Sequence, residues 1–227
     1  MTRQLPLDLP ARPALGRDDF FVSPANADAL AAIERWPGWP GGKLLLCGAP
    51  GAGKTHLVHV WAARSGGHVL AARQLAQTDV AALVETGRDI ALEDIDRIAG
   101  DAPAERALFH LHNLALAEGR RLLLSSTEER PDLALPDLHS RIAGTPRARL
   151  HPPDDALLSA VLIKLFADRQ LTVPPRVIGH LARRMERSLS VAARVVATLD
   201  SLSLARQCRI TPRLADSALD IVARSGQ

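Results

Sequence analysis

The sequence is poor in the residues that build extracellular scaffolds and membrane spans. Its 227 residues include only two cysteines, Cys47 and Cys208, too few for a disulfide framework or a cysteine metal site, and we expect both to be buried. No apolar run approaches the ~20 residues of a membrane-spanning helix. The first residues, MTRQLPLDLPARP, lack the apolar core and cleavage site of a secretory signal. These absences predict a cytoplasmic protein.

Aromatic residues are also scarce. They make up 3% of the chain, tyrosine is absent, and the formal net charge is only +3. The basic excess lies in residues 154–227, which hold 11 basic and 7 acidic residues. A nucleic-acid-binding surface usually combines a stronger basic stripe with aromatic side chains. We therefore expect no direct sequence-specific DNA binding and interpret this excess as solvated surface charge.

The histidines predict no metal site. His56 and His59, and likewise His110 and His112, lack the i, i+4 spacing of helical zinc ligands, and no HExxH pattern surrounds them. We interpret these histidines as residues of helix faces or of the core.

The pattern of residues 43–150 is typical of an α/β protein. Apolar runs alternate with helical periodicity, as in a parallel sheet covered by helices, and the overall content of 47% hydrophobic and 23% charged residues is that of a soluble globular chain. Strands are expected at 43–47, 69–71, 89–92, 121–125 and 148–150, and helices at about 24–37, 55–64 and 103–118.

A purely helical segment is expected after the breaker His151-Pro152-Pro153. Its periodicity predicts helices at about 154–169, 174–186, 189–204 and 212–223. The sequence therefore divides into an N-terminal arm (1–19), an α/β nucleotide-binding domain (20–152) and an all-α lid domain (153–227).

One motif carries specific chemistry. The residues GAPGAGKT match GxxxxGK[ST] at every fixed position and lie between an expected strand and an expected helix. Glycines let backbone N–H groups turn toward phosphates, the lysine reaches the β- and γ-phosphates, and the hydroxyl binds Mg²⁺. The predicted phosphate site is Gly48, Ala49, Pro50, Gly51, Ala52, Gly53, Lys54 and Thr55.

Such a site needs an acidic group from a neighbouring strand tip to hold the metal. Glu93 and Asp94 follow the apolar run at 90–92, so we expect them, with Thr55, to hold Mg²⁺ and to take part in catalysis. Glutamate stands where aspartate is usual, so intrinsic hydrolysis is expected to be slow. Asp96 is interpreted as a helix-start residue.

Ser125-Ser126-Thr127 ends the expected fourth strand. Its hydroxyls, Thr127 foremost, lie where a polar sensor of the γ-phosphate would lie. The same residues also suit the start of a turn before Pro131, and the sequence favours neither reading.

The run LLLCGAPGAGKTHLVHVW resembles the corresponding region of the bacterial replication initiator DnaA, where the motif is likewise followed by THL-x-H. RDDFFVSPANADAL, ALEDIDRIAGD, LLLSSTEERP and LPDLHSRIAG extend the likeness over roughly residues 18–222. The resemblance implies an AAA+ module and adds His56 to the nucleotide-binding residues. We expect no helix-turn-helix domain, because the sequence ends at Gln227, directly after the helical segment.

The N-terminal arm contains QLPLDL, which resembles the QLxLx[LF] peptide that docks on the bacterial sliding clamp. In such an extended segment a glutamine forms hydrogen bonds while leucines fill an apolar groove, so Gln4, Leu5, Leu7 and Leu9 are the expected clamp-binding residues. A DnaA-like module with this arm resembles the Hda/HdaA family. The resemblance implies three roles: binding the DNA polymerase III β sliding clamp, acting on DnaA, and promoting hydrolysis of DnaA-bound ATP.

The resemblance also assigns arginines. His139-Ser140-Arg141-Ile142 is similar to the family's box VII, which makes Arg141 an arginine finger for the nucleotide of a neighbouring DnaA; the alternative is a helix-end arginine paired with Asp137. The family's sensor 2 position falls on Ala193, with Arg194 beside it and Arg187 two turns earlier, and Arg194 is the expected nucleotide contact. If no such arginine reaches the nucleotide, ADP rather than ATP becomes the expected working ligand.

Two other function classes fit parts of the pattern. A free-standing AAA+ ATPase of helicase-loader or transposition-helper type (DnaC/IstB-like) would hydrolyse ATP vigorously and bind single-stranded DNA without residues 4–9. A small-molecule kinase is disfavoured, because the expected acceptor-binding lid between the strands is missing. Self-association through the surfaces used for a partner, giving a homodimer, is also open.

Overall fold

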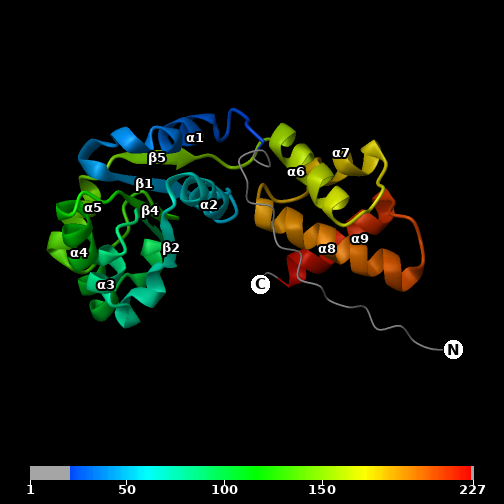
Figure 1. Cartoon of the computed structure of the whole chain (residues 1–227). Helices are drawn as coiled ribbons and strands as arrows, with labels where there is room; N and C mark the ends of the chain where they lie inside the picture. The colour runs from blue at the N-terminus through cyan, green and yellow to red at the C-terminus, as the bar shows by residue number, and fades with distance from the viewer. Residues whose placement is uncertain (1–20, 226–227) are drawn as a thin grey trace.

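The computed structural model describes residues 21–225. Five parallel strands form one sheet in the order β2-β3-β4-β1-β5 (Figure 1). The predicted P-loop-type parallel sheet flanked by helices is confirmed. The strands are β1 (Lys43–Gly48), β2 (His68–Ala71), β3 (Ile90–Glu93), β4 (Leu122–Ser126) and β5 (Arg147–Leu150).

Strand β1, which lies between β4 and β5, is buried on both faces. Leu45 aligns with Leu124 of β4 on one side and with Arg147 of β5 on the other. Successive side chains of a strand point to opposite faces, so Leu44 and Leu46 belong to one core while Leu45 and Cys47 belong to the other. This double burial explains the nearly continuous apolar run KLLLC.

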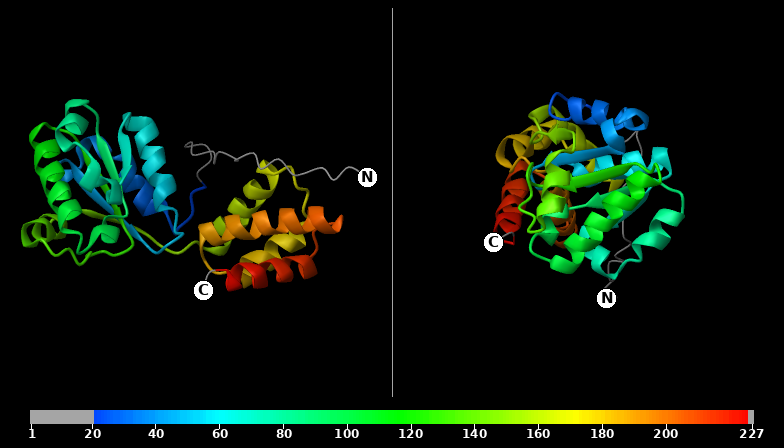
Figure 2. Two further views of the ribbon diagram at one scale, coloured as in Figure 1. Left: turned by 90° about the horizontal axis from the view of Figure 1, so that it is seen from below. Right: turned by 90° about the vertical axis from the view of Figure 1, so that its left-hand side faces the viewer.

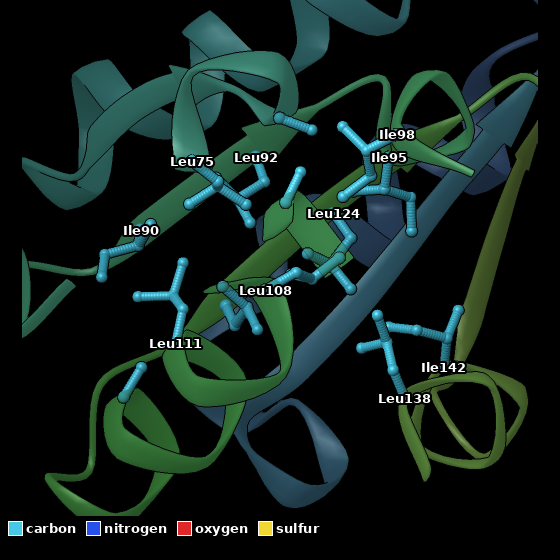
Figure 3. Close-up of a cluster of buried hydrophobic side chains, with 14 of the residues drawn as sticks. Leu75, Ile90, Leu92, Ile95, Ile98, Leu108, Leu111, Leu124, Leu138 and Ile142 are labelled. Atoms are coloured by element: carbon cyan, nitrogen blue, oxygen red, sulfur yellow. The ribbon is translucent and has the colours of Figure 1, made fainter. Parts of the chain in front are cut away.

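Two layers of helices cover the sheet. One face packs against α1 (Ala27–Glu34) and α2 (Lys54–Ser65), in a core that includes the stacked rings of Trp39 and Trp61. The other face carries the larger core, part of which is drawn in Figure 3. Its covering elements are η4 (Ala72–Gln77), α3 (Val80–Glu85), η5 (Ile95–Ile98), α4 (Ala102–Ala117) and α5 (Pro136–Ala143), and two short turns, η2 (Trp36–Gly38) and η3 (Pro40–Gly42), precede β1.

The four C-terminal helices form a separate group beside the sheet, with an apolar core of their own (Figures 1 and 2). We call this group the helical segment. Asp154, Ser188 and Thr211 cap α6, α8 and α9 by accepting a hydrogen bond from the backbone N–H three residues on. The helices are α6 (Asp155–Asp168), α7 (Pro175–Arg184), α8 (Leu189–Arg206) and α9 (Pro212–Arg224). Among residues 21–225, no helix is long and apolar enough to cross a bilayer.

Most expected elements lie within one to three residues of their observed bounds, and two helices were not expected. These are α3 and α5, with six and eight residues, which are too short to show a clear helical period and are held by packing. The expectation that both cysteines are buried is wrong for Cys208, which is exposed in the turn between α8 and α9. The expected arm 1–19 lies outside the described residues.

His112 is a buried histidine held in its neutral form. Its ring, 1% exposed, lies on α4, and its Nε2 is 3.0 Å from Nζ of Lys43. An ammonium group has no lone pair, so Lys43 donates and Nε2 accepts. Burial, and then the positive charge of Lys43, lower the pKa of His112 from 6.5 to about 4.

We therefore expect the protein to lose stability as the pH falls from about 6.5 toward 4. In that range the unfolded histidine takes up a proton that folded His112 does not, so the free energy of unfolding falls, by about 2 kcal/mol at pH 5. Urea unfolding at pH 7.5 and pH 5 would measure this. His112→Leu should remove that part of the pH dependence, whereas His110→Asn, on the exposed side of the same helix, should retain it.

Candidate functional site: the phosphate loop and its surroundings

Residues 49–53 form the loop between β1 and α2. Its backbone enters the left-handed region at Gly51 (φ 73°) and Gly53 (φ 106°), which glycine adopts without strain. Gly51 also has no room for a side chain, because a Cβ there would overlap the hydroxyl of Ser188. The Leu189 N–H donates to the carbonyl of Gly51 at 2.8 Å, so the start of α8 rests directly on this loop.

Lys54 is the first residue of α2 and is only 7% exposed. Its ammonium donates to the carbonyls of Gly48 (2.7 Å) and Ala49 (3.3 Å), inside the loop it would share with a phosphate. Burial lowers the pKa of Lys54, and the carboxylates of Asp94 and Asp96 oppose that shift. A phosphate entering the loop would replace weak carbonyl acceptors with full negative charge.

A hollow of about 300 Å³ opens at this loop. Four segments that are far apart in the sequence line it: the phosphate loop with the start of α2, the start of η5, the residue after β4, and the start of α8. The lining residues are Pro50, Gly51, Gly53, Lys54, Thr55, Asp94, Arg97, Thr127, Leu189 and Ser190. The other predicted residues do not line it: Gly48 ends β1, Ala49 and Ala52 belong to the loop, and His56 lies in the first turn of α2.

The two predicted acidic residues have different positions. Asp94 lines the hollow, in a left-handed conformation (φ 57°) that is costly for a residue with a side chain, and its N–H donates to Oγ of Ser125 at 3.1 Å. Glu93 is not among the lining residues. Its Oε1 is buried, and no hydrogen-bond partner for it exists among residues 21–225. Of the expected Mg²⁺ ligands, the hollow therefore brings together Thr55 and Asp94 but not Glu93.

Asp96 binds Thr127, a role the sequence did not predict. Its carboxylate accepts the Thr127 hydroxyl at 2.6 Å and the Thr127 N–H at 3.0 Å. Burial favours a higher pKa for Asp96, but the hydrogen bonds from Thr127 outweigh it and the pKa is lowered. Asp96 lies in the first turn of η5, as expected of a helix-start residue, while the N-cap position itself is occupied by Asp94. Thr127 lines the hollow, and its hydroxyl proton is already donated to Asp96.

The arginine at the hollow is Arg97, not Arg194. Arg97 projects from η5, and sequence reasoning missed it because η5 is a single 3₁₀ turn without a periodic pattern. Exposed Arg194 lines a different hollow, together with Arg184 and Glu186. Arg187 donates to the Pro153 carbonyl and pairs with Asp155 at the start of α6. In the described part of the chain, no arginine of the helical segment lines the phosphate hollow.

Arg141 lies at the opposite edge of the sheet. It is exposed on the last turn of α5, and no carboxylate among residues 21–225 pairs with it, Asp137 included. Its carbonyl accepts a hydrogen bond from Nζ of Lys43, the first residue of β1. The phosphate loop follows Gly48, the last residue of the same strand. The expected clamp-binding residues Gln4, Leu5, Leu7 and Leu9 lie outside the described residues.

Comparison with known proteins supports the resemblance at the level of the fold. No family model matches the chain. The chromosomal replication initiator protein DnaA of Thermomicrobium roseum is 28% identical over 228 residues, which cover 89% of this chain and 48% of that protein. The chain thus spans about half the length of that relative. Domain III of DnaA from Thermotoga maritima superposes with a TM-score of 0.78 at 19% identity, over 94% of this chain and 99% of that one.

The chain has the AAA+ fold of DnaA domain III. The AMPPCP-bound DnaA of Aquifex aeolicus is similar as well, with a TM-score of 0.66 at 16% identity over 86% of this chain and 66% of that one. This homology extends over most of the chain. It establishes the AAA+ replication-initiator fold without distinguishing an initiator from a regulator.

Proposed function

We propose that this AAA+ protein is a nucleotide-binding regulator of replication initiation of the Hda type. It holds ADP or ATP with Mg²⁺ in its own phosphate hollow, binds the DNA polymerase III β sliding clamp through residues 4–9, and promotes hydrolysis of the ATP bound to DnaA. Its own ATPase is weak or absent. The homology to DnaA supports a place in replication initiation, the residues of the hollow support nucleotide binding, and the resemblance of QLPLDL to a clamp-binding peptide supports clamp binding.

The observation that carries this proposal is the position of Arg141. Six-residue β1 separates the Lys43 contact of Arg141 from the phosphate loop, which at about 3.3 Å a residue is roughly 17 Å. Arg141 therefore cannot contact a nucleotide in its own hollow, yet it is exposed and unpaired with any described carboxylate. Such a guanidinium is free to enter the nucleotide site of a neighbouring AAA+ subunit and stabilise the charge on a transferring γ-phosphoryl group.

The residues of the hollow suit a nucleotide with a hard metal ion. Lys54 and the N-terminus of α2 supply positive charge for phosphates, and the Thr55 hydroxyl and Asp94 carboxylate are oxygen ligands of the kind Mg²⁺ prefers. The DnaA of Aquifex aeolicus is described as bound to AMPPCP, which supports the same ligand class here. When bound, Mg²⁺ neutralises phosphate charge, while this chain supplies the loop, the lysine and the carboxylate.

We expect Lys54→Ala to abolish nucleotide binding, because it removes the one ammonium group inside the loop. Equilibrium titration with ADP and ATP, each with Mg²⁺, would measure this. Lys164→Ala, on α6 outside the hollow, is the matched control and should bind as wild type. Unchanged affinity in Lys54→Ala would remove the nucleotide site, and a strong ATP preference in the wild type would contradict ADP as the working ligand.

Arg141→Ala is expected to abolish the stimulation of ATP hydrolysis in DnaA. The assay combines the protein, ATP-loaded DnaA and clamp loaded on DNA, and follows conversion of DnaA-bound ATP to ADP. An arginine finger is worth ~10³ to 10⁵ in rate, so hydrolysis should return to the unstimulated level. Arg176→Ala, an exposed arginine on α7, serves as the control. Normal stimulation by the Arg141 variant would reject the assignment.

Clamp binding separates this proposal from a free-standing ATPase. The double variant Gln4→Ala/Leu7→Ala should lose binding in a clamp pull-down, because it removes the hydrogen-bonding and apolar anchors of the peptide while leaving residues 21–225 intact. A control with Arg3→Ala should keep it. Equal clamp capture by both variants would count against the peptide and favour the helicase-loader or transposition-helper class. The same class would be favoured if the wild type fails to bind the clamp but hydrolyses ATP vigorously and binds single-stranded DNA.

A further inference from the structure

Glu105 is a fully buried carboxylate on α4, 1% exposed, that contacts no cation among residues 21–225. Its oxygens instead accept three backbone N–H groups: Gly100 at 2.8 Å, Ala134 at 3.0 Å and Leu135 at 2.7 Å. A buried charge is costly unless hydrogen bonds satisfy it, and here they come from two separate segments of the chain.

The first of these segments leads to the phosphate hollow. Gly100 follows η5 by two residues, and η5 begins directly after Asp94 and contains Arg97, both of which line the hollow. Asp96 of the same turn holds Thr127, a third lining residue. The backbone that Glu105 holds at Gly100 is therefore the end of the segment that would touch a bound nucleotide.

The second segment leads to Arg141. Leu135 is the N-cap of α5, and its apolar side chain cannot accept a hydrogen bond from the first turn of the helix. The start of α5 is held instead by the hydrogen bond that the Leu135 N–H donates to Glu105. At the other end of α5, the carbonyl of Arg141 accepts Oγ1 of Thr145 at 2.9 Å and Nζ of Lys43 at 3.4 Å. The helix that presents Arg141 is thus held at both ends by polar contacts.

Packing joins the same three elements. Ile98 of η5, Leu108 of α4 and Leu138 of α5 are buried in one apolar cluster, and Figure 3 shows them around the same part of the sheet. Burial favours a higher pKa for Glu105, but the three N–H groups outweigh it and the pKa is lowered, so the carboxylate is ionised at neutral pH. A charged acceptor binds backbone N–H groups more strongly than a neutral one.

We propose that Glu105 is a positioning residue that couples the phosphate hollow to the Arg141 helix. A nucleotide that contacts Asp94 and Arg97 restrains η5 and Gly100, and the shared carboxylate passes this restraint to Ala134, Leu135 and α5. The role of Arg141 rests on the proposed function, whereas the coupling itself is measurable without DnaA.

Hydrogen exchange followed by mass spectrometry tests the coupling on the full chain, with and without saturating ADP and Mg²⁺. In the wild type, ADP should slow exchange several-fold in residues 49–56 and also in residues 134–143. Glu105→Gln replaces one acceptor oxygen with an NH₂ group facing N–H donors, so slowing should persist at 49–56 and disappear at 134–143. Glu118→Gln, exposed at the end of the same helix, should behave as wild type.

Each other outcome counts against a named step. Slowing confined to residues 49–56 in the wild type would overturn the coupling, and equal slowing of 134–143 in Glu105→Gln would overturn the role of Glu105. No slowing anywhere in the wild type would overturn nucleotide binding and the coupling together. If Glu105→Gln does not fold by circular dichroism, Leu135→Pro removes one N–H donor at a φ of −76°, which suits proline, and should give the same uncoupling.

The DnaA assay gives a second readout, which a general loss of structure would not produce. Glu105→Gln should lower the maximal stimulation several-fold with an unchanged half-saturating concentration, and should add nothing in an Arg141→Ala background. A raised half-saturating concentration at full maximal rate, or additive losses in the double variant, would reject positioning of Arg141. If exchange is coupled but Arg141→Ala still stimulates DnaA normally, the coupling stands and the proposed function is rejected.

Discussion

The whole arrangement depends on the parallel pairing of β1 with β4 on one side and with β5 on the other. Parallel strands end at the same edge, so the loops that follow β1, β3 and β4 meet there and form one hollow from distant segments. The same pairing sends the other ends of the strands, and the Arg141 turn of α5, to the opposite edge. One register thus places the candidate phosphate site and Arg141 about one strand length apart.

At the carboxyl edge, short polar contacts replace regular structure. Ser125 accepts the N–H of Asp94, and Asp96 binds both the N–H and the hydroxyl of Thr127, so the tips of β3 and β4 are joined by side chains where backbone pairing ends. The start of α8 adds a contact from the helical segment through Leu189 and Gly51. Nucleotide binding in this hollow would therefore act on the sheet and the helical segment at once.

Helix α5 illustrates how a short element gains a defined position. Eight residues do not form a stable helix alone, and its N-cap lacks an accepting side chain. Burial of Leu138 and Ile142 fixes one face, while Glu105, Thr145 and Lys43 hold its ends. Presentation of Arg141 depends on these contacts from other elements, and the proposed link from the nucleotide hollow to Arg141 runs through one of them.

The sequence by itself determined the layered α/β architecture, the phosphate loop and the helical segment. These follow from local patterns: apolar runs buried on both faces, glycines required at positive φ, and helical periods long enough to recognise. It did not predict α3 and α5, whose stability comes from packing, nor the exposure of Cys208.

Tertiary structure alone decided which polar residues meet. It brought Arg97 and Ser190 to the hollow, joined Asp96 to Thr127, left Glu93 and Arg194 outside and placed Arg141 at the far edge, because each of these outcomes depends on contacts between segments about 30 or more residues apart.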